Sequence, residues 1–332
     1  MEESFNLEDF NTGENKDSNA NNLTSPKDTA EPTLVKSRGR NNPNQGVKFK
    51  QWAEISPGTY TGIGKISKIL PPALYRIAMD DRGNYYFEIQ PIKTDELLRF
   101  SDSLADEILS EIDRFWELKK QFEINKFSHR RGYLLYGPQG SGKSIIVQQI
   151  IEGIIHRNGI AIWVDKNPKM ITTAIVEALR IVEPTRPIVV IFEDIDAIIQ
   201  DYGESAILSY LDGDGRIDGV LNLATTNYPE KLDKRVVARP RRFDRVVKVD
   251  VPSPSIRKEY FKYKVKDLTE EQLEQWTTST AGFSFAALAD LIISVKCFEY
   301  KFEDAAERLR KLLDSNPSSE EFKTRKTGFN AH

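Results

Sequence analysis

Short apolar runs alternate with stretches of helical spacing over residues 131–250. The apolar runs lie at residues 133–136, 160–164, 188–192, 220–225 and 246–249. Largely apolar runs of this length are typical of strands that are covered on both faces. Their alternation with helices predicts an α/β fold built on a doubly wound parallel sheet.

A hairpin pattern precedes this segment. Residues 75–80 and 85–90 are strand-like runs on either side of the turn 81–84. Alternating strands around a glycine-containing turn predict a β-hairpin. We expect this hairpin to belong to a small N-terminal β-rich module over residues 48–92.

Helical patterns flank the sheet segment on both sides. Apolar side chains recur at helical spacing over residues 102–122, which predicts an amphipathic helix within a linker over residues 93–130. After Pro252 the spacing is helical again, and this predicts a helical unit over residues 251–314.

Composition limits the remaining possibilities. Residues 1–47 are polar and poor in apolar side chains, which predicts a disordered tail, and residues 315–332 predict a flexible one. The net charge of -3 gives no global positive field for collecting nucleic acid. Cys297 is the one cysteine, and the three histidines do not cluster with it, so neither a disulfide nor a zinc site is expected. With no signal peptide and no apolar run long enough to cross a bilayer, we expect a cytoplasmic protein without a membrane partner.

A glycine-rich loop follows the first apolar run of the sheet segment. It has the pattern of a P-loop, a glycine, four variable residues, and then Gly-Lys-Ser before a helix. Backbone N–H groups of such a loop surround phosphate oxygens, the lysine reaches the β- and γ-phosphates, and the serine hydroxyl binds Mg²⁺. The residues expected to bind nucleotide are Gly137, Pro138, Gln139, Gly140, Ser141, Gly142, Lys143, Ser144 and Ile145. The sequence therefore predicts binding of ATP with Mg²⁺.

Three further signals accompany the P-loop. Glu193 and Asp194 end a buried strand, and Asn227 follows the end of another. Ligands of open α/β sheets bind at the carboxyl ends of the strands, so these side chains are candidates for catalysis. The run 239–245 is dense in arginine, which suits phosphate contact.

These four elements, in this order and spacing, resemble the AAA+ ATPases, specifically the classical AAA clade. The loop 137–144 resembles Walker A, residues 192–197 resemble Walker B, and Asn227 matches the sensor-1 position. The resemblance implies a P-loop NTPase core, a C-terminal helical lid, and Ser144, Glu193 and Asp194 around Mg²⁺. It also implies that Arg239 and Arg242 act as arginine fingers on the ATP of a neighbouring subunit, usually in a hexamer.

The chain departs from the family pattern in three ways. The acids are inverted, Glu193 before Asp194, so that by position Glu193 would serve Mg²⁺ and Asp194 would polarise water. No aromatic residue stands in the stretch 165–184, where the family carries its first pore loop. Phe285 stands where the lid motif has a small glycine.

We therefore expect an ATP hydrolase that assembles into a homo-hexamer or a similar ring and remodels a client, a protein rather than a nucleic acid. Two alternatives stay open. One is a nucleic-acid-dependent ATPase such as a helicase or loader, and the other is an ATP-gated scaffold with little hydrolysis.

Overall fold

The computed structural model describes residues 51–56, 59–63, 67–81, 83–92, 104–165, 167–212, 217–237 and 242–314. The chain divides into two compact units, Met1–Ile66 and Ser67–His332. The described part of the first unit is an antiparallel pair of strands, β1 (Gln51–Ser56) and β2 (Thr59–Ile63). The tails expected at 1–47 and 315–332 lie outside the described residues.

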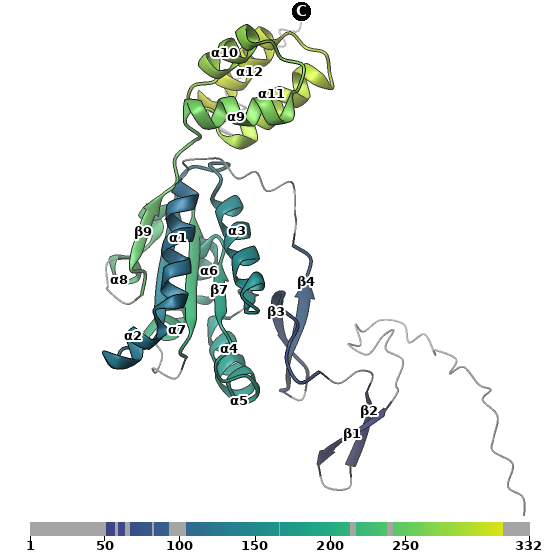
Figure 1. Ribbon diagram of the computed structural model, residues 1–332, viewed down its shortest axis with the longest axis vertical. Helices are drawn as coiled ribbons and strands as arrows, with labels where there is room; N and C mark the ends of the chain where they lie inside the picture. The colour runs from purple at the N-terminus through teal and green to yellow at the C-terminus, as the bar shows by residue number, and fades with distance from the viewer. Residues whose placement is uncertain are drawn as a thin grey trace, which may run out of the picture. The chain divides into compact units, whose positions relative to one another are not determined.

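The second unit, drawn in Figure 1, is built on a seven-stranded sheet. Its strand order is β4-β3-β6-β7-β8-β5-β9. Its five predicted strands run parallel to one another and are β5 (Arg130–Tyr136), β6 (Ile160–Trp163), β7 (Ile188–Phe192), β8 (Val220–Thr226) and β9 (Arg245–Lys248). The predicted doubly wound parallel sheet is confirmed. Tyr136 pairs with Thr226, and Phe192 pairs with Ala224, so the loops after β5, β7 and β8 leave the sheet at the same edge.

The predicted hairpin is part of this sheet and not of a separate module. Strand β3 (Leu74–Met79) pairs antiparallel with β4 (Tyr85–Gln90) and parallel with β6, Leu74 lying opposite Ala161. The module expected over 48–92 is therefore corrected: the boundary between units lies at Ile66. The pairing of β3 with β6 joins segments more than eighty residues apart, which a local pattern does not reveal.

A buried ion pair fixes the chain where it enters β3. Glu183 and Arg186 pair at 2.7 Å, with side chains that are 6% and 8% exposed. The Leu70 N–H donates to Glu183 at 2.8 Å, and Arg186 donates to the Leu70 carbonyl at 2.9 Å. Both backbone groups of Leu70 are thus satisfied by the core of the second unit.

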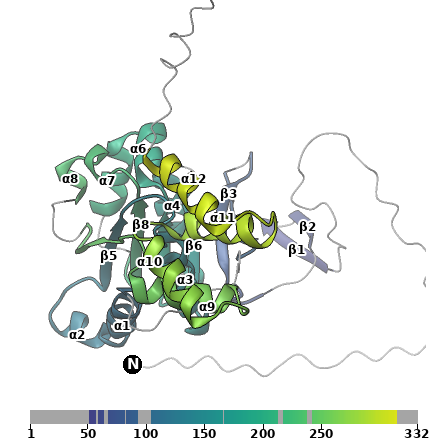
Figure 2. The same ribbon diagram turned by 90° about the horizontal axis from the view of Figure 1, so that it is seen from above.

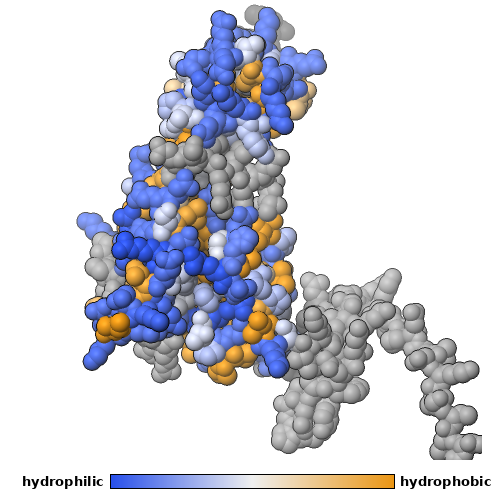
Figure 3. Space-filling model, viewed as in Figure 1, coloured by the Kyte–Doolittle hydropathy of each residue, from blue (hydrophilic) through white to orange (hydrophobic). Residues whose placement is uncertain are grey.

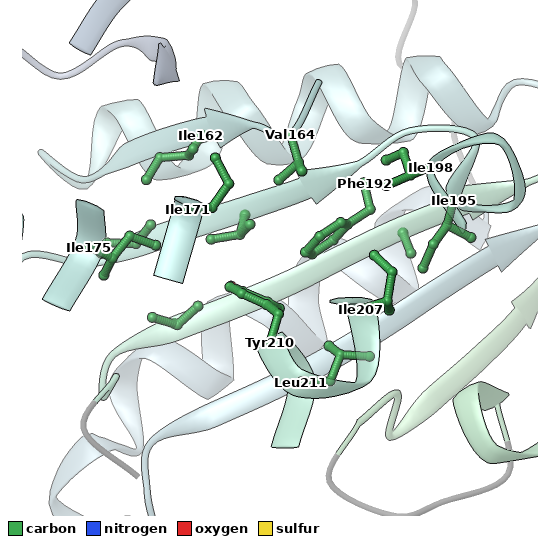
Figure 4. Packing of buried hydrophobic residues seen from close by; sticks show 14 of the residues in the cluster. Ile162, Val164, Ile171, Ile175, Phe192, Ile195, Ile198, Ile207, Tyr210 and Leu211 are labelled. Atoms are coloured by element: carbon green, nitrogen blue, oxygen red, sulfur yellow. The ribbon is translucent and has the colours of Figure 1, made fainter. Parts of the chain in front are cut away.

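Helices cover both faces of the sheet, as Figure 2 shows for α1 (Leu104–Glu117) and α3 (Lys143–His156) on one side and α6 (Ile195–Tyr202) and α7 (Glu204–Asp212) on the other. Successive residues of a strand pack into cores on opposite faces of the sheet, because side chains alternate along a strand. Val189 and Ile191 pack with α1 and α3, whereas Ile188, Val190 and Phe192 pack on the other face. Figure 4 shows that second core, in which Phe192 faces Tyr210 of α7.

The second face also carries a chain of short helices. They are α4 (Pro168–Thr173), a π-helical turn η1 (Ala174–Leu179) and α5 (Arg180–Val182). Ile171 and Ile175 of this chain point into the core of Figure 4. Beyond β8 follow a 3-10 turn η2 (Pro229–Lys231) and α8 (Lys234–Val237).

The helix expected over 102–122 is divided in the structure. It forms α1 and a shorter α2 (Lys119–Ile124), with a break at Leu118. The apolar spacing continues past the break because Phe122 still packs on Phe115, with ring centroids 5.8 Å apart, and on His129. The apolar periodicity therefore predicted the shared core of the two helices but not the break between them.

The C-terminal helices form a bundle with its own core. They are α9 (Pro254–Lys264), α10 (Glu270–Ser279), α11 (Phe285–Lys296) and α12 (Phe302–Asp314). Phe261, Trp276 and Phe283 are buried at its centre, and Trp276 stacks on Phe302 at 4.8 Å. Figure 3 shows a largely hydrophilic outer surface on these helices, as expected when their apolar faces are turned inward.

Among the described residues, no helix is long and apolar enough to cross a membrane.

Candidate active site

The glycine-rich loop connects β5 to α3 and is shaped by close backbone packing. Gly140 and Gly142 have φ of +73° and +106°, conformations that residues with a side chain rarely adopt. At Gly137 an ideal Cβ would lie 2.0 Å from the backbone oxygen of Val249, so only glycine fits there. Helix α3 begins at Lys143, and the free N–H groups of its first turn therefore border the loop.

Lys143 lies at the centre of the loop. Its Nζ donates to the carbonyl oxygens of Gly137 and Pro138, both at 2.9 Å, and to Oδ1 of Asn227 at 2.7 Å. The residue is 7% exposed, and burial lowers the pKa of Lys143, while the charges of Asp194 and Glu193 act in the opposite direction. Oxygen acceptors already surround this ammonium, and a phosphate oxygen is a stronger acceptor of the same kind.

The two acids after β7 point to different partners. The Ser144 hydroxyl donates to Oε1 of Glu193 at 2.8 Å, which ties this acid to the start of α3. Asn227 donates through Nδ2 to Oδ1 of Asp194 at 3.2 Å. Hydrogen bonds thus join the ends of β7 and β8 to the loop and the start of α3 in two groups, Lys143–Asn227–Asp194 and Ser144–Glu193.

The direction of the Asp194 side chain follows from an unusual backbone conformation at this residue. It precedes α6 with φ +49° and ψ 56°, the left-handed region, which aspartate tolerates better than most residues. Its N–H donates to Oγ1 of Thr225 at 3.1 Å, and this bond holds the turn.

Two residues of the site were not assigned from the sequence. Thr225 supports Asp194, and Thr226 donates to Asp196 at 2.7 Å while accepting the N–H of Tyr228 at 3.0 Å. Both threonines are buried. The signal that points to them is two polar residues inside the apolar run that ends β8.

The loop and acids enclose a cavity of about 320 Å³. We call it the phosphate cavity. Its lining includes nine residues that the sequence predicts for the site, namely Gln139, Gly140, Gly142, Lys143, Ser144, Ile145, Glu193, Asp194 and Asn227. Of the predicted loop residues, Gly137 and Pro138 contribute carbonyl oxygens to Lys143 instead.

A second cavity of about 350 Å³ lies on the other side of Gly142. We call it the base cavity. Ile145, Ile146 and Ile256 give it apolar walls, and backbone from 249 to 252 lies beside them. Ser141 also lines it, with a buried hydroxyl that has no hydrogen-bond partner among the described residues. An apolar slot with a few polar groups is suited to a nucleotide base.

The side-chain oxygens at the phosphate cavity are suited to Mg²⁺ that is bound together with phosphate. No group of three or more His, Cys, Asp or Glu side chains that could hold a metal occurs in the described part of the chain. Mg²⁺ is bound by one or two carboxylates plus substrate phosphates rather than by an all-protein cage. The Ser144 hydroxyl and the Glu193 and Asp194 carboxylates at the phosphate cavity supply such oxygens.

The arginines of the 239–245 run are placed differently from one another. Arg239 lies outside the described residues. Arg242 is 4% exposed; its Nε donates to Asp212 at 2.6 Å, it pairs with the second oxygen of Asp212, and it also donates to the Arg235 carbonyl. The hydrogen bond to Asp212 raises the pKa of Arg242. An action of Arg242 on a neighbouring subunit would require it to leave Asp212, and the finger roles of Arg239 and Arg242 stay predictions.

The stretch expected to hold the pore loop has no aromatic side chain in its described part, residues 165 and 167–184. Met170 of this stretch lies on α4 and packs against the core of the sheet.

A family model described as "ATPase family associated with various cellular activities (AAA)" matches residues 133–251. The chain is 31% identical over 211 residues to the ATP-dependent zinc metalloprotease FtsH 2 of Salinibacter ruber, covering 57% of this chain and 30% of that protein. It is 28% identical over 265 residues to the proteasome-activating nucleotidase of Saccharolobus solfataricus, covering 68% of this chain and 66% of that protein. The human ATPase family gene 2 protein homolog A is 27% identical over 180 residues, covering 48% of this chain and 20% of that protein.

The chain thus spans less than two thirds of the length of each of these relatives. The matched region contains the loop, the acids and Asn227, and these are the elements that the structure joins at one sheet edge. Residues 133–251 thus match the AAA family, and the chain is similar to AAA+ ATPases of the classical AAA clade.

Proposed function

We propose that the protein binds ATP with Mg²⁺ and hydrolyses it to ADP and phosphate. One observation carries the proposal. Two hydrogen-bonded groups, Lys143–Asn227–Asp194 and Ser144–Glu193, border a single cavity at the end of the P-loop.

Binding is assigned to the loop. N–H groups at the start of α3 and the Lys143 ammonium would hold the phosphate oxygens, with the base in the apolar cavity beyond Gly142. Ser144 and Glu193, whose oxygens lie 2.8 Å apart, would hold the metal ion. The ion would offset the negative charge of the phosphates.

Hydrolysis is assigned to Asp194 and Asn227. The carboxylate of Asp194 would accept a proton from the attacking water, and Asn227 would orient that water and the γ-phosphate. The water oxygen bonds to the γ-phosphorus as the bond to the β–γ bridging oxygen breaks, and ADP leaves. The Lys143–Asn227–Asp194 chain of contacts supports this division because it places Asp194 beside the lysine that would reach the γ-phosphate.

Phosphate release in the presence of Mg²⁺ tests the proposal. Lys143→Ala removes the cation that would bind the β- and γ-phosphates, and we expect at least about a hundredfold loss of kcat/KM. Lys311→Ala is the matched control, since this lysine is 75% exposed on α12 and borders neither cavity. Purified protein that releases no phosphate, or equal loss in both variants, contradicts the assignment.

We propose further that the protein acts on a protein client as a homo-hexamer or similar ring, with Arg239 and Arg242 reaching a neighbour's ATP. The relatives' names support the client class, because they include ATP-dependent proteases and a proteasome-activating nucleotidase. DNA-stimulated turnover with a steep salt dependence would favour the nucleic-acid alternative instead.

A further inference from the structure

Phe285 is the first residue of α11 and lies against the P-loop. Its N–H donates to the carbonyl oxygen of Gly140 at 2.9 Å. An ideal Cβ on Gly142 would lie 3.1 Å from Cε2 and 3.4 Å from Cδ2 of the Phe285 ring. The ring edge thus lies beside the glycine that precedes α3, next to the space that a side chain there would fill.

The neighbours of Phe285 extend this contact. An ideal Cβ on Gly140 would lie 2.9 Å from Cβ of Ala286 and 3.0 Å from Oγ of Ser284. Three consecutive residues of the helical bundle therefore sit on the two left-handed glycines of the loop. We call this contact of residues 284–286 with Gly140 and Gly142 the clasp.

The clasp lies between the two halves of the nucleotide site. The phosphate cavity and the base cavity share Gly142, Ile145 and Phe285 as lining residues. A nucleotide with its base in one cavity and its phosphates in the other must pass over Gly142. The edge of the Phe285 ring occupies the space directly beside that glycine.

We propose that Phe285 is the positioning residue that couples nucleotide binding to movement of the helical bundle. With the ring on Gly142 the path between the cavities is narrowed, and the nucleotide binds once the ring leaves the loop. The Phe285 ring also packs edge-on against Tyr260 of the bundle, with ring centroids 5.6 Å apart, so in this proposal the ring leaves the loop together with α11. This inference rests on the proposed nucleotide site.

The clasp predicts that a shorter side chain at position 285 favours nucleotide binding. When only a fraction of the protein is competent, the apparent dissociation constant is raised by the inverse of that fraction. For Phe285→Ala we expect association of a fluorescent ATP analogue, with Mg²⁺, to be about tenfold faster, and the dissociation constant to fall by a similar factor.

The measurement is stopped-flow binding to the full chain. Tyr300→Ala is the matched control, an aromatic truncation in the bundle at a residue that is 56% exposed and borders neither cavity, and it should bind like the wild type. Phe285→Leu keeps an apolar contact with Tyr260 and should bind faster than the wild type; it carries the test if circular dichroism shows that the alanine variant is misfolded.

The outcomes separate this inference from the function on which it rests. If the wild type binds the analogue and folded Phe285 variants bind it no faster, or more weakly, the gating role is wrong and the nucleotide site stands. If no variant and no wild-type protein binds nucleotide, the proposed function itself fails.

Discussion

At the scale of the residue, the inverted acids are distinguished by their surroundings and not by their order. Glu193 is tied to Ser144, whereas Asp194 is turned by a left-handed backbone toward Asn227. The sequence places both acids after β7. It does not show that they diverge, because the φ of Asp194 depends on a hydrogen bond to Thr225, thirty-one residues away.

Because Glu193 and Asp194 have different partners, we predict different defects when each carboxylate is replaced by the matching amide. Asp194→Asn keeps a residue that tolerates left-handed backbone but removes the proton acceptor, so ATP binding should persist while turnover falls about a hundredfold or more. Glu193→Gln removes a metal-binding charge, so the Mg²⁺ concentration for half-maximal activity should rise.

Steady-state phosphate release over a Mg²⁺ series, together with nucleotide binding, checks both expectations. Normal turnover by Asp194→Asn, with none by Glu193→Gln at saturating Mg²⁺, would show that the roles are the reverse.

At the scale of the element, local patterns predicted which strands form and not which strands pair. The alternation over 75–80 and 85–90 correctly gave a hairpin. It gave no sign that β3 would extend the nucleotide-binding sheet beside β6, since that choice depends on the shape of the β6 edge and on the Glu183–Arg186 contacts with Leu70.

The stability of the core should therefore depend on the hairpin. Ile77 of β3 is fully buried with the second core, and Ile77→Ala should lower the free energy of unfolding by about 2 to 5 kcal/mol. Met79→Ala in the same strand is the control, because Met79 is 49% exposed and its loss should cost about 0.5 kcal/mol or less. Chemical denaturation followed by fluorescence compares them; equal small effects would mean that the hairpin does not belong to the cooperative core.

At the scale of the whole molecule, we propose that the site is shared between subunits. Within one protomer Arg242 is held by Asp212, and it does not line the phosphate cavity. The finger roles of Arg239 and Arg242 are therefore a statement about an assembly.

Mixing two inactive variants tests that statement. Arg239→Ala retains its own acids, and Asp194→Asn retains its arginine, so an interface between one copy of each contains a complete site. We expect each variant alone to be nearly inactive and an equimolar mixture to regain part of the wild-type phosphate release. Full activity of Arg239→Ala by itself would remove this arginine from the site, and a mixture no more active than its parts would place the complete site within one chain.

The sequence by itself determined the P-loop, the parallel sheet and the resemblance to the AAA family, because loop spacing, apolar runs and polar strand ends are local properties of the chain. Tertiary structure decided how Asp194 is turned, where β3 pairs and what Phe285 touches. Each of these depends on a contact between segments far apart along the chain, and such contacts are selected by the packing of the whole core and not by any one segment.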